Sequence, residues 1–288
     1  MHLVWSYGTI LAKTAVGSSF ERQSTGNTVS MAEELVRQGI FTTEVLEFLR
    51  VCILARLNLA IAGPPRSGKR MLLHTLVDLV SSDGQILAIQ NPDEPSLECK
   101  GITTLRANLH PDQGKHRIPR DYLLTLAPKM HPQGLLLDGV DGSEAVALLK
   151  LLLAMDGVWF SMIAESPEDA LSRLEDWVLV HGAELGADMI RRILSTSLHL
   201  VIQLGKARDG VPTIVSLTEV GEVERDAPAL RDIFARQNLG LKETASRGAL
   251  RPTGIKPHFL DRMEMLGISI PEGIFIQPTT KTEPPREP

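Results

Sequence analysis

The sequence predicts an α/β protein in which helices cover both faces of a mostly parallel sheet. Three observations support this prediction. Apolar runs of strand length recur along the chain at residues 59–62, 85–90, 134–139 and 158–164. Segments with helical periodicity separate these runs, and strands that alternate with helices form a parallel sheet buried on both sides. The first run leads into a glycine-bounded loop and then a helix, which is an arrangement that binds phosphate.

The glycine-bounded loop follows the strand at 59–62 directly. Its residues are Gly63, Pro64, Pro65, Arg66, Ser67, Gly68, Lys69 and Arg70, and an apolar-periodic helix continues from Met71. The spacing fits the P-loop pattern G-x-x-x-x-G-K-[ST] through Lys69 and then departs from it. The hydroxyl that coordinates Mg²⁺ should stand at position 70, which is an arginine. We predict that residues 63–71 bind a nucleotide or another phosphate, and the arginine argues against bound Mg²⁺.

Two questions about this loop stay open at the level of the sequence. A glycine loop can be kept only to pack a strand against a helix, although Lys69 then has little reason to be there. Arg70 can supply positive charge in place of Mg²⁺, or it can fill the pocket and exclude the metal.

Helices are predicted on the N-terminal side of the loop. Ser30 and Glu33 form a capping-box pattern that opens a short helix, which Gly39 can end. A second helix is predicted from residue 43 to residue 56, because its apolar residues recur on one helical face. Residues 1–29 carry loop-like composition, and we interpret them as a linker or as the remnant of an N-terminal region.

The middle of the chain alternates between strands and helices. A polar stretch at 91–119 holds only scattered apolar residues, and such a long connection in a compact domain is usually functional. Helices are predicted at 121–126 and 143–155, on either side of the strand at 134–139. Ser166 as N-cap and Pro167 as first helical residue predict a further helix through about residue 174.

The C-terminal part is predicted to hold a helix at 188–195 and a β-hairpin. The hairpin strands are 199–204 and 213–220, joined by a turn at 208–210. The tail at 277–288 is rich in proline and charge and is predicted to be disordered. Residues 30–276 are therefore predicted to form the main domain.

The composition is that of an ordinary globular protein and excludes several classes of function. The 288 residues carry a net charge of −5, so neither nucleic acid nor an acidic membrane surface is indicated as a partner. Cys52 and Cys99 have no metal or redox spacing and are predicted to be reduced thiols. The apolar stretch at 145–164 is interrupted by charge and glycine, which predicts a helix, a turn and a strand instead of a membrane span. A cytoplasmic protein is predicted.

Longer stretches carry a family resemblance that extends from about residue 30 to residue 275. These stretches are EFLRVCILARLNLAIAG, SPEDALSRLEDWVL, QLGKARDG with TIVSLTEV, and LDRMEMLGISIPEGIF. They resemble the ATPases of type II/IV secretion and tight-adherence pilus assembly, and most closely the CpaF/TadA branch. The resemblance implies a RecA-like P-loop core, a hexameric ring, ATP or another nucleotide as ligand, and inner-membrane pilus or secretion components as partners. It also implies a cytoplasmic chain, or one peripheral at the inner membrane.

The sequence departs from the family's catalytic pattern at nearly every position. The resemblance places the hydroxyl that binds Mg²⁺ at Arg70, the catalytic glutamate at Gly139, a glycine at Asp138, an arginine at Asp141, a histidine at Ile163, and acidic residues at Gln90 and Asn91. The family's arginines that reach neighbouring phosphates fall near Thr104 and Asn108, with Arg106 close by. Phosphoryl transfer depends on positioning and on electrostatic stabilisation, so these losses leave little to catalyse with.

Asp138 and Asp141 are the candidate catalytic acids that remain. Asp138 ends a strand one residue before the expected glutamate, so alternation predicts that it points to the opposite side unless the strand bulges. It is still the best candidate for an acid that faces a metal. Asp141 and Glu144 are predicted to belong to the turn and to the N-terminus of the next helix. The eight histidines have no metal-ligand spacing, and no metal site is predicted.

Three functions compete at this stage. The preferred hypothesis is a non-hydrolysing, pseudo-ATPase subunit or regulator that associates with an active paralogue. The first alternative is an active ATPase that uses Asp138 or Asp141 in an altered metal site. The second alternative is a scaffold or phosphate sensor without a motor partner.

Overall fold

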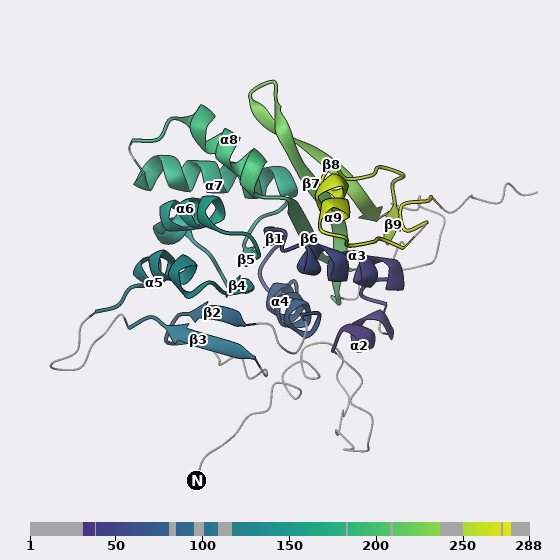
Figure 1. Cartoon of the computed structure of the whole chain (residues 1–288), viewed down its shortest axis with the longest axis horizontal. Helices are drawn as coiled ribbons and strands as arrows, with labels where there is room; N and C mark the ends of the chain where they lie inside the picture. Colours follow the sequence, from purple (N-terminus) through teal and green to yellow (C-terminus); the bar gives the residue numbers. More distant parts are fainter. Residues whose placement is uncertain are drawn as a thin grey trace, which may run out of the picture.

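A nine-stranded sheet with helices on both faces forms the core of the computed structural model (Figure 1). The structure describes residues 31–37, 39–80, 85–94, 101–108, 117–182, 184–207, 210–236, 250–271 and 273–277. The predicted α/β class is confirmed. The predictions for residues 1–29, for the cap at Ser30 and for the tail after residue 277 lie outside the described residues.

The described strands and helices have the following bounds. The strands are β1 Leu59–Ala62, β2 Ile86–Gln90, β3 Ile102–Arg106, β4 Gly134–Leu137, β5 Val158–Met162, β6 Leu200–Lys206, β7 Pro212–Glu224, β8 Ala227–Arg236 and β9 Leu250–Pro252. The helices are α2 Met31–Arg37, α3 Thr43–Leu54, α4 Lys69–Asp78, α5 Arg120–Leu126, α6 Ala145–Ala154, α7 Pro167–His181, α8 Ala187–Ser197 and α9 Leu260–Met265, with 3-10 turns η1 Ala127–Met130 and η2 Gly142–Glu144.

The sheet has a parallel part and an antiparallel part. Its strand order is β3-β2-β4-β5-β1-β6-β7-β8-β9. Strands from β3 to β6 pair in parallel, and β6, β7, β8 and β9 pair antiparallel. The predicted hairpin is therefore present as β6 and β7. The strand that precedes the P-loop, β1, lies between β5 and β6, near the middle of the sheet.

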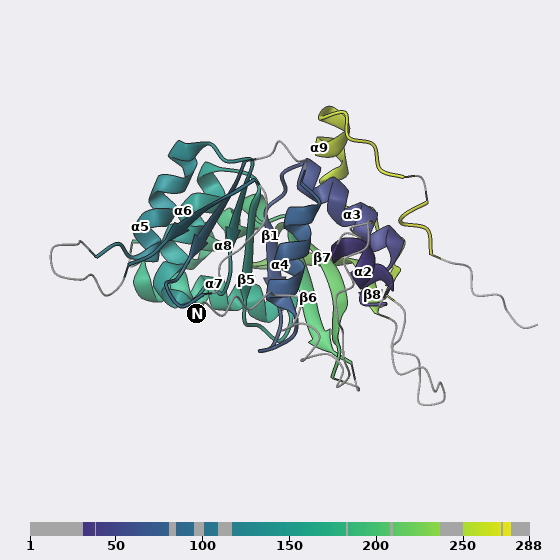
Figure 2. The same cartoon turned by 90° about the horizontal axis from the view of Figure 1, so that it is seen from below.

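Each face of the sheet packs against its own set of helices. Alternate residues of β1 point to opposite faces: Leu59 and Ile61 join the core formed with α2, α3 and α4, and Ala60 and Ala62 join the core formed with α5 to α8. Figure 2 shows the two helix layers on opposite sides of the strands. Because every residue of β1 is buried, the loop that follows it starts from a fixed position.

A buried asparagine fixes the amino end of β1. The side chain of Asn58 donates to the carbonyl of Ser197 (2.7 Å) and accepts from the backbone N–H of Val158 (2.9 Å). The indole of Trp159 donates to the carbonyl of Leu57 at 3.2 Å and fills the space left by Gly134. These contacts hold β1, β4 and β5 together at the end of the sheet opposite the P-loop.

Two predictions about elements need correction. The polar stretch 91–119 contains the edge strand β3, whose residues are exposed or only half-buried, and so it lacks the apolar run of a central strand. The helix predicted to end near residue 174 continues to His181, because Leu174 and Val178 extend its buried face. The strands β8 and β9 had no counterpart in the sequence prediction.

The interrupted apolar stretch is organised as predicted. Helix α6 ends at Ala154, a turn with Gly157 at φ +80° follows, and β5 begins at Val158. Among the described residues, each helix is too short or too polar to cross a membrane.

Candidate functional site

The P-loop lies between the carboxyl end of β1 and the first turn of α4, and two glycines allow its close packing. A Cβ on Gly63 would lie 2.6 Å from Ser67 Oγ and 2.7 Å from the carbonyl oxygen of Leu204. Gly68 is the N-cap of α4 with φ +89°, a conformation that favours glycine, and a Cβ there would lie 2.9 Å from Pro212 Cβ. The loop therefore keeps a backbone path that other residues would strain.

The loop retains donors suited to a phosphate group. The backbone N–H groups in the first turn of a helix have no partner within the helix, and the helix dipole favours an anion there. The hydroxyl of Ser67 is fully buried and has no hydrogen-bond partner among the described residues. Buried polar groups normally have a partner, so this hydroxyl fits a site that a ligand oxygen completes.

Lys69 lies against its own loop. Its ammonium donates to the carbonyl oxygens of Gly63 and Pro64, both at 2.8 Å, which uses two of its three N–H donors. Burial lowers the pKa of Lys69, and the nearby carboxylates of Asp138 and Glu165 oppose this shift. The ammonium is thus held at the loop, where its remaining donor can contact a bound anion.

Arg70 forms an ion pair with Asp138 at the carboxyl end of β4. Arg70 Nε lies 3.0 Å from Asp138 Oδ2. The other carboxylate oxygen of Asp138 accepts from Ser161 Oγ at 2.6 Å, and Ser161 Oγ in turn accepts from the backbone N–H of Gly139 at 2.8 Å. Side chains from α4, β4 and β5 therefore meet beside the P-loop.

The expectation that Asp138 points away from the P-loop is wrong. Alternation itself holds, because Leu136 packs in the core on the α4 side of the sheet and Asp138, two residues later, points to the same side. The face assigned to the expected glutamate at position 139 was the error. The strand β4 ends at Leu137, and Gly139 has φ +67°, so alternation does not continue through this position.

The other predicted positions carry no acid or base into the same cluster. Asp141 is exposed and caps η2, where its carboxylate accepts from the backbone N–H and the hydroxyl of Ser143 (2.9 and 2.6 Å). Gly139 offers no side chain, and Ile163 is an apolar residue that is 49% exposed just after β5. Of the two amides, Gln90 is buried and Asn91 donates to Glu94. Arg106 donates to the carbonyls of Pro92 and Glu94.

A buried arginine organises the end of β4 and was not predicted from the sequence. Arg120, only 3% exposed, donates to the carbonyl oxygens of Asp138 (2.8 Å) and Gly139 (3.3 Å). The same guanidinium lies 3.4 Å from Glu144 Oε1 and 3.8 Å from Glu94 Oε1. We call Arg120, Glu94 and Glu144 the Arg120 cluster. The partners of Arg120 come from three separate segments, and no local sequence pattern predicts them.

The Arg120 cluster places two carboxylates around one cation. Burial raises the pKa of Glu144 to about 7, and Arg120 only partly opposes this shift. Burial likewise raises the pKa of Glu94. One guanidinium cannot compensate the charges of both the buried Glu144 and the half-buried Glu94, so the cluster favours a proton on one of the two carboxyl groups near neutral pH.

The site fits a phosphate group but does not fit Mg²⁺. The phosphate would meet the first turn of α4, the Ser67 hydroxyl and Lys69. A P-loop metal needs a hydroxyl at position 70, and the guanidinium of Arg70 has no acceptor atom to offer. Among the described residues, no three His, Cys, Asp or Glu side chains gather where they could hold a metal ion.

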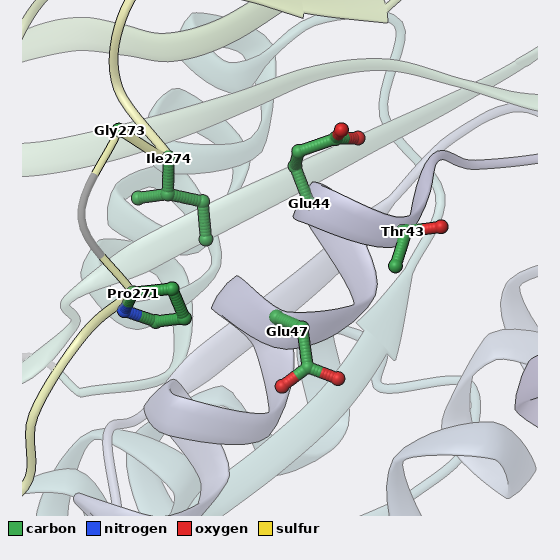
Figure 3. Close-up of a pocket in the computed structure, with 6 residues that line it drawn as sticks. All are labelled: Thr43, Glu44, Glu47, Pro271, Gly273 and Ile274. Carbon is green, nitrogen blue, oxygen red and sulfur yellow. The ribbon is translucent and has the colours of Figure 1, made fainter.

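A surface pocket of about 300 Å³ lies elsewhere, between α3 and the C-terminal segment (Figure 3). It is lined by Thr43, Glu44, Glu47, Pro271, Gly273 and Ile274. The carboxylates of Glu44 and Glu47 point away from each other, so they do not form a common cation site.

Comparison with known families decides the affiliation of the chain. The family model described as "Uncharacterised conserved protein UCP018868" matches residues 25–193, which is more than half of the 288 residues. The chain belongs to this family. The matched range of the family contains the P-loop, the Arg120 cluster and the Arg70–Asp138 ion pair.

Individual relatives connect the chain to secretion ATPases. The VirB11 proteins of Rhizobium radiobacter and of Agrobacterium tumefaciens (strain 15955) are each 23% identical to it over 202 residues, covering 69% of this chain and 57% of VirB11. The crystal structure of the Brucella suis VirB11 ATPase, determined in complex with sulphate, is similar with a TM-score of 0.54 and 23% identity, covering 65% of this chain and 54% of that one.

These similarities confirm the predicted family relation at the level of the fold. The chain is a distant relative of VirB11 and has the RecA-like fold of the secretion ATPases. It spans just over half the length of the relatives that it matches. The closer assignment to the CpaF/TadA branch stays a prediction.

Proposed function

We propose that this chain is a non-hydrolysing, CpaF/TadA-like member of the secretion and pilus-assembly ATPases, and that it binds a nucleotide or another phosphate at residues 63–71. It acts as a subunit or regulator in an oligomer, in the form of a hexameric ring, together with an active paralogue. Its place of action is the cytoplasm, at the inner-membrane components of a pilus or secretion system.

The state of Asp138 is the observation that carries the non-hydrolysing assignment. Both of its carboxylate oxygens are engaged, one by Arg70 and the other by Ser161. Each oxygen keeps one further acceptor site, but the positive charge of Arg70 beside it disfavours a metal ion, and the next residue, Gly139, has no side chain. Hydrolysis of a nucleoside triphosphate needs such groups, and the loss of each typically costs orders of magnitude in rate.

The P-loop supports retained binding. Ser67 is buried without a partner, Lys69 stays at the loop, and the backbone path at Gly63 and Gly68 is preserved. The sulphate in the Brucella suis VirB11 complex shows that a protein of this fold accepts a phosphate-like anion. We extend this property to residues 63–71 because their donors suit the same chemistry.

An ATP-turnover assay on the purified chain tests the proposal. We expect turnover no higher than that of a Lys69→Ala variant, together with measurable binding of ATP or ADP by the unaltered chain. Turnover that Lys69→Ala abolishes would establish the active-ATPase alternative instead. Binding without association to an intact motor of the same system, measured by light scattering of a mixed sample, would favour the phosphate sensor.

A further inference from the structure

We propose that the Arg70–Asp138 ion pair takes the place of the metal ion in this P-loop, so that the site binds the phosphates of a nucleotide as the metal-free anion. This inference rests on the proposed phosphate binding at residues 63–71. It selects one of the two roles that the sequence left open for Arg70, namely the supply of positive charge in place of Mg²⁺.

Arg70 occupies the position of the hydroxyl that normally holds the metal, and Asp138 is the acid that remains at the end of β4, one residue before the position of the family's glutamate. In P-loop NTPases, Mg²⁺ is held by the hydroxyl after the P-loop lysine and by an acid at the end of another strand. Here position 70 and the acid at the end of β4 are in direct contact, with Arg70 Nε 3.0 Å from Asp138 Oδ2. A cation of the protein therefore stands at the position of the metal-binding hydroxyl and contacts the acid that remains at the end of β4.

The contacts of Asp138 disfavour Mg²⁺ at the same carboxylate. The ion requires nearly octahedral oxygen coordination at about 2.0–2.1 Å and gives up its water ligands reluctantly. The oxygens of Asp138 already bind Arg70 and Ser161, and Ser161 is fixed by the backbone N–H of Gly139. A metal would have to displace the guanidinium and would meet its positive charge.

The surroundings supply cations that suit an anion without its metal. Arg66 lies in the loop itself, and Lys206 at the end of β6 is close enough to Lys69 to contribute to lowering its pKa. Glu165 lies on the same side and offsets part of this charge. A metal-free nucleotide carries two more negative charges than its Mg²⁺ complex, and Arg66 and Lys206 are two cations beyond the P-loop lysine.

Calorimetry with ADP and ATP, in EDTA and in excess Mg²⁺, tests this inference on the full chain. We expect binding in EDTA to be at least as tight as binding in Mg²⁺, because the metal complex loses charge that the site attracts. Binding that requires Mg²⁺ would overturn the inference and leave the proposed phosphate binding intact. Absence of binding in both conditions would overturn the proposed binding itself, and with it this inference.

The Arg70→Thr variant provides a more direct test of the inference. It restores the hydroxyl and frees Asp138, so we expect nucleotide binding that becomes at least tenfold tighter in Mg²⁺ than in EDTA. Arg66→Asn removes a cation of the same loop without creating the metal position, and asparagine tolerates the left-handed backbone of residue 66 (φ +62°), so its binding should stay independent of Mg²⁺. Equal responses of the two variants to Mg²⁺ would contradict the inference. Thermal unfolding of both variants verifies that they fold, and the comparison of EDTA with Mg²⁺ on the unaltered chain holds whether or not they do.

Discussion

The P-loop and the end of β4 lie side by side in this site, yet they satisfy their polar groups in opposite ways. The loop at residues 63–70 keeps a buried hydroxyl that has no hydrogen-bond partner among the described residues, and it leads into the start of α4, where the first N–H groups have no partner within the helix. At the end of β4, Asp138 is held from both sides and Arg120 binds two backbone carbonyls. Under the proposed function, binding is kept while hydrolysis is lost, because binding depends on backbone geometry and hydrolysis depends on particular side chains.

The largest effect is expected from removal of Arg120, the cation at the end of β4. Arg120→Ala leaves the buried Glu144 and the half-buried Glu94 without their partner, and loss of one member of a buried ion pair typically costs about 3–5 kcal/mol. Urea unfolding measures the change. Arg173→Ala removes an exposed pair with Asp169 and should cost only about 0.3–0.5 kcal/mol. Similar losses in both variants would show that the Arg120 cluster is not a buried network.

A second test removes Lys69, the cation of the P-loop, and is expected to affect binding instead of stability. Lys69→Ala should lower the affinity for a nucleotide at least tenfold, or about 1.4 kcal/mol, while changing the stability of the free protein little. Among the described residues, its ammonium donates to two loop carbonyls, so the rest of the fold does not depend on it. Calorimetry and thermal unfolding on the same samples separate the two effects. A large loss of stability with unchanged affinity would assign Lys69 a structural role.

The protonation of Glu144 should make the stability of the protein depend on pH. Its pKa is raised to about 7 in the folded state, so the folded protein binds more protons than the unfolded chain between about pH 4.5 and 7. The stability that this group contributes is present at low pH and is lost as the pH rises through 7, with a slope of at most about 1.4 kcal/mol per pH unit.

The Glu144→Gln variant isolates this contribution. Burial lowers the pKa of His74 and His199 to about 4, so these two histidines lower the unfolding free energy as the pH falls through the same window. Their effect on the pH dependence is therefore opposite to that of Glu144. The difference in unfolding free energy between the variant and the unaltered chain removes the histidines from the comparison. We expect that difference to grow in favour of Glu144→Gln as the pH rises from 5 to 7. A constant difference would mean that Glu144 does not titrate there.

The smallest expected effect concerns the backbone at the position of the missing glutamate. Gly139 has φ +67° with open space around a Cβ, so Gly139→Ala should cost about 1 kcal/mol through backbone strain alone. Gly186, the N-cap of α8, has equally open surroundings at φ −75°, and Gly186→Ala should cost only about 0.5 kcal/mol, through the weaker cap. Thermal unfolding compares the two. Gly139→Glu should restore no ATP turnover, because Arg70 still holds Asp138.

Among the strands, the sequence predicted those that are buried along most of their length. It missed β3, β8 and β9, in which most residues are exposed or half-buried. The strands at 59–62 and 158–162 are continuous apolar runs and were recognised as such. The edge strand β3 mixes exposed and half-buried residues, so its composition resembles that of a loop. At the site, the P-loop was predictable because its pattern is local.

The Arg120 cluster was not predictable, because it joins residues that are distant in the sequence. Glu94 precedes Arg120 and Glu144 follows it, and each belongs to a different segment of the fold. The face of Asp138 was assigned wrongly for a related reason. Alternation gives the relative orientation of neighbouring side chains, but only the packing of α4 shows which face lies toward the P-loop.

The contact of the P-loop with β6 and β7 has a mechanical consequence. Gly63 lies against the carbonyl of Leu204 and Gly68 against the ring of Pro212, with no room for one additional carbon atom at either point. A ligand that widens the loop must therefore shift the beginning of β7 or the end of β6. Through the long pairing of β7 with β8, such a shift extends into the antiparallel half of the sheet. Amide exchange at residues 204–206 and 213–214 should therefore respond first when a ligand occupies the loop.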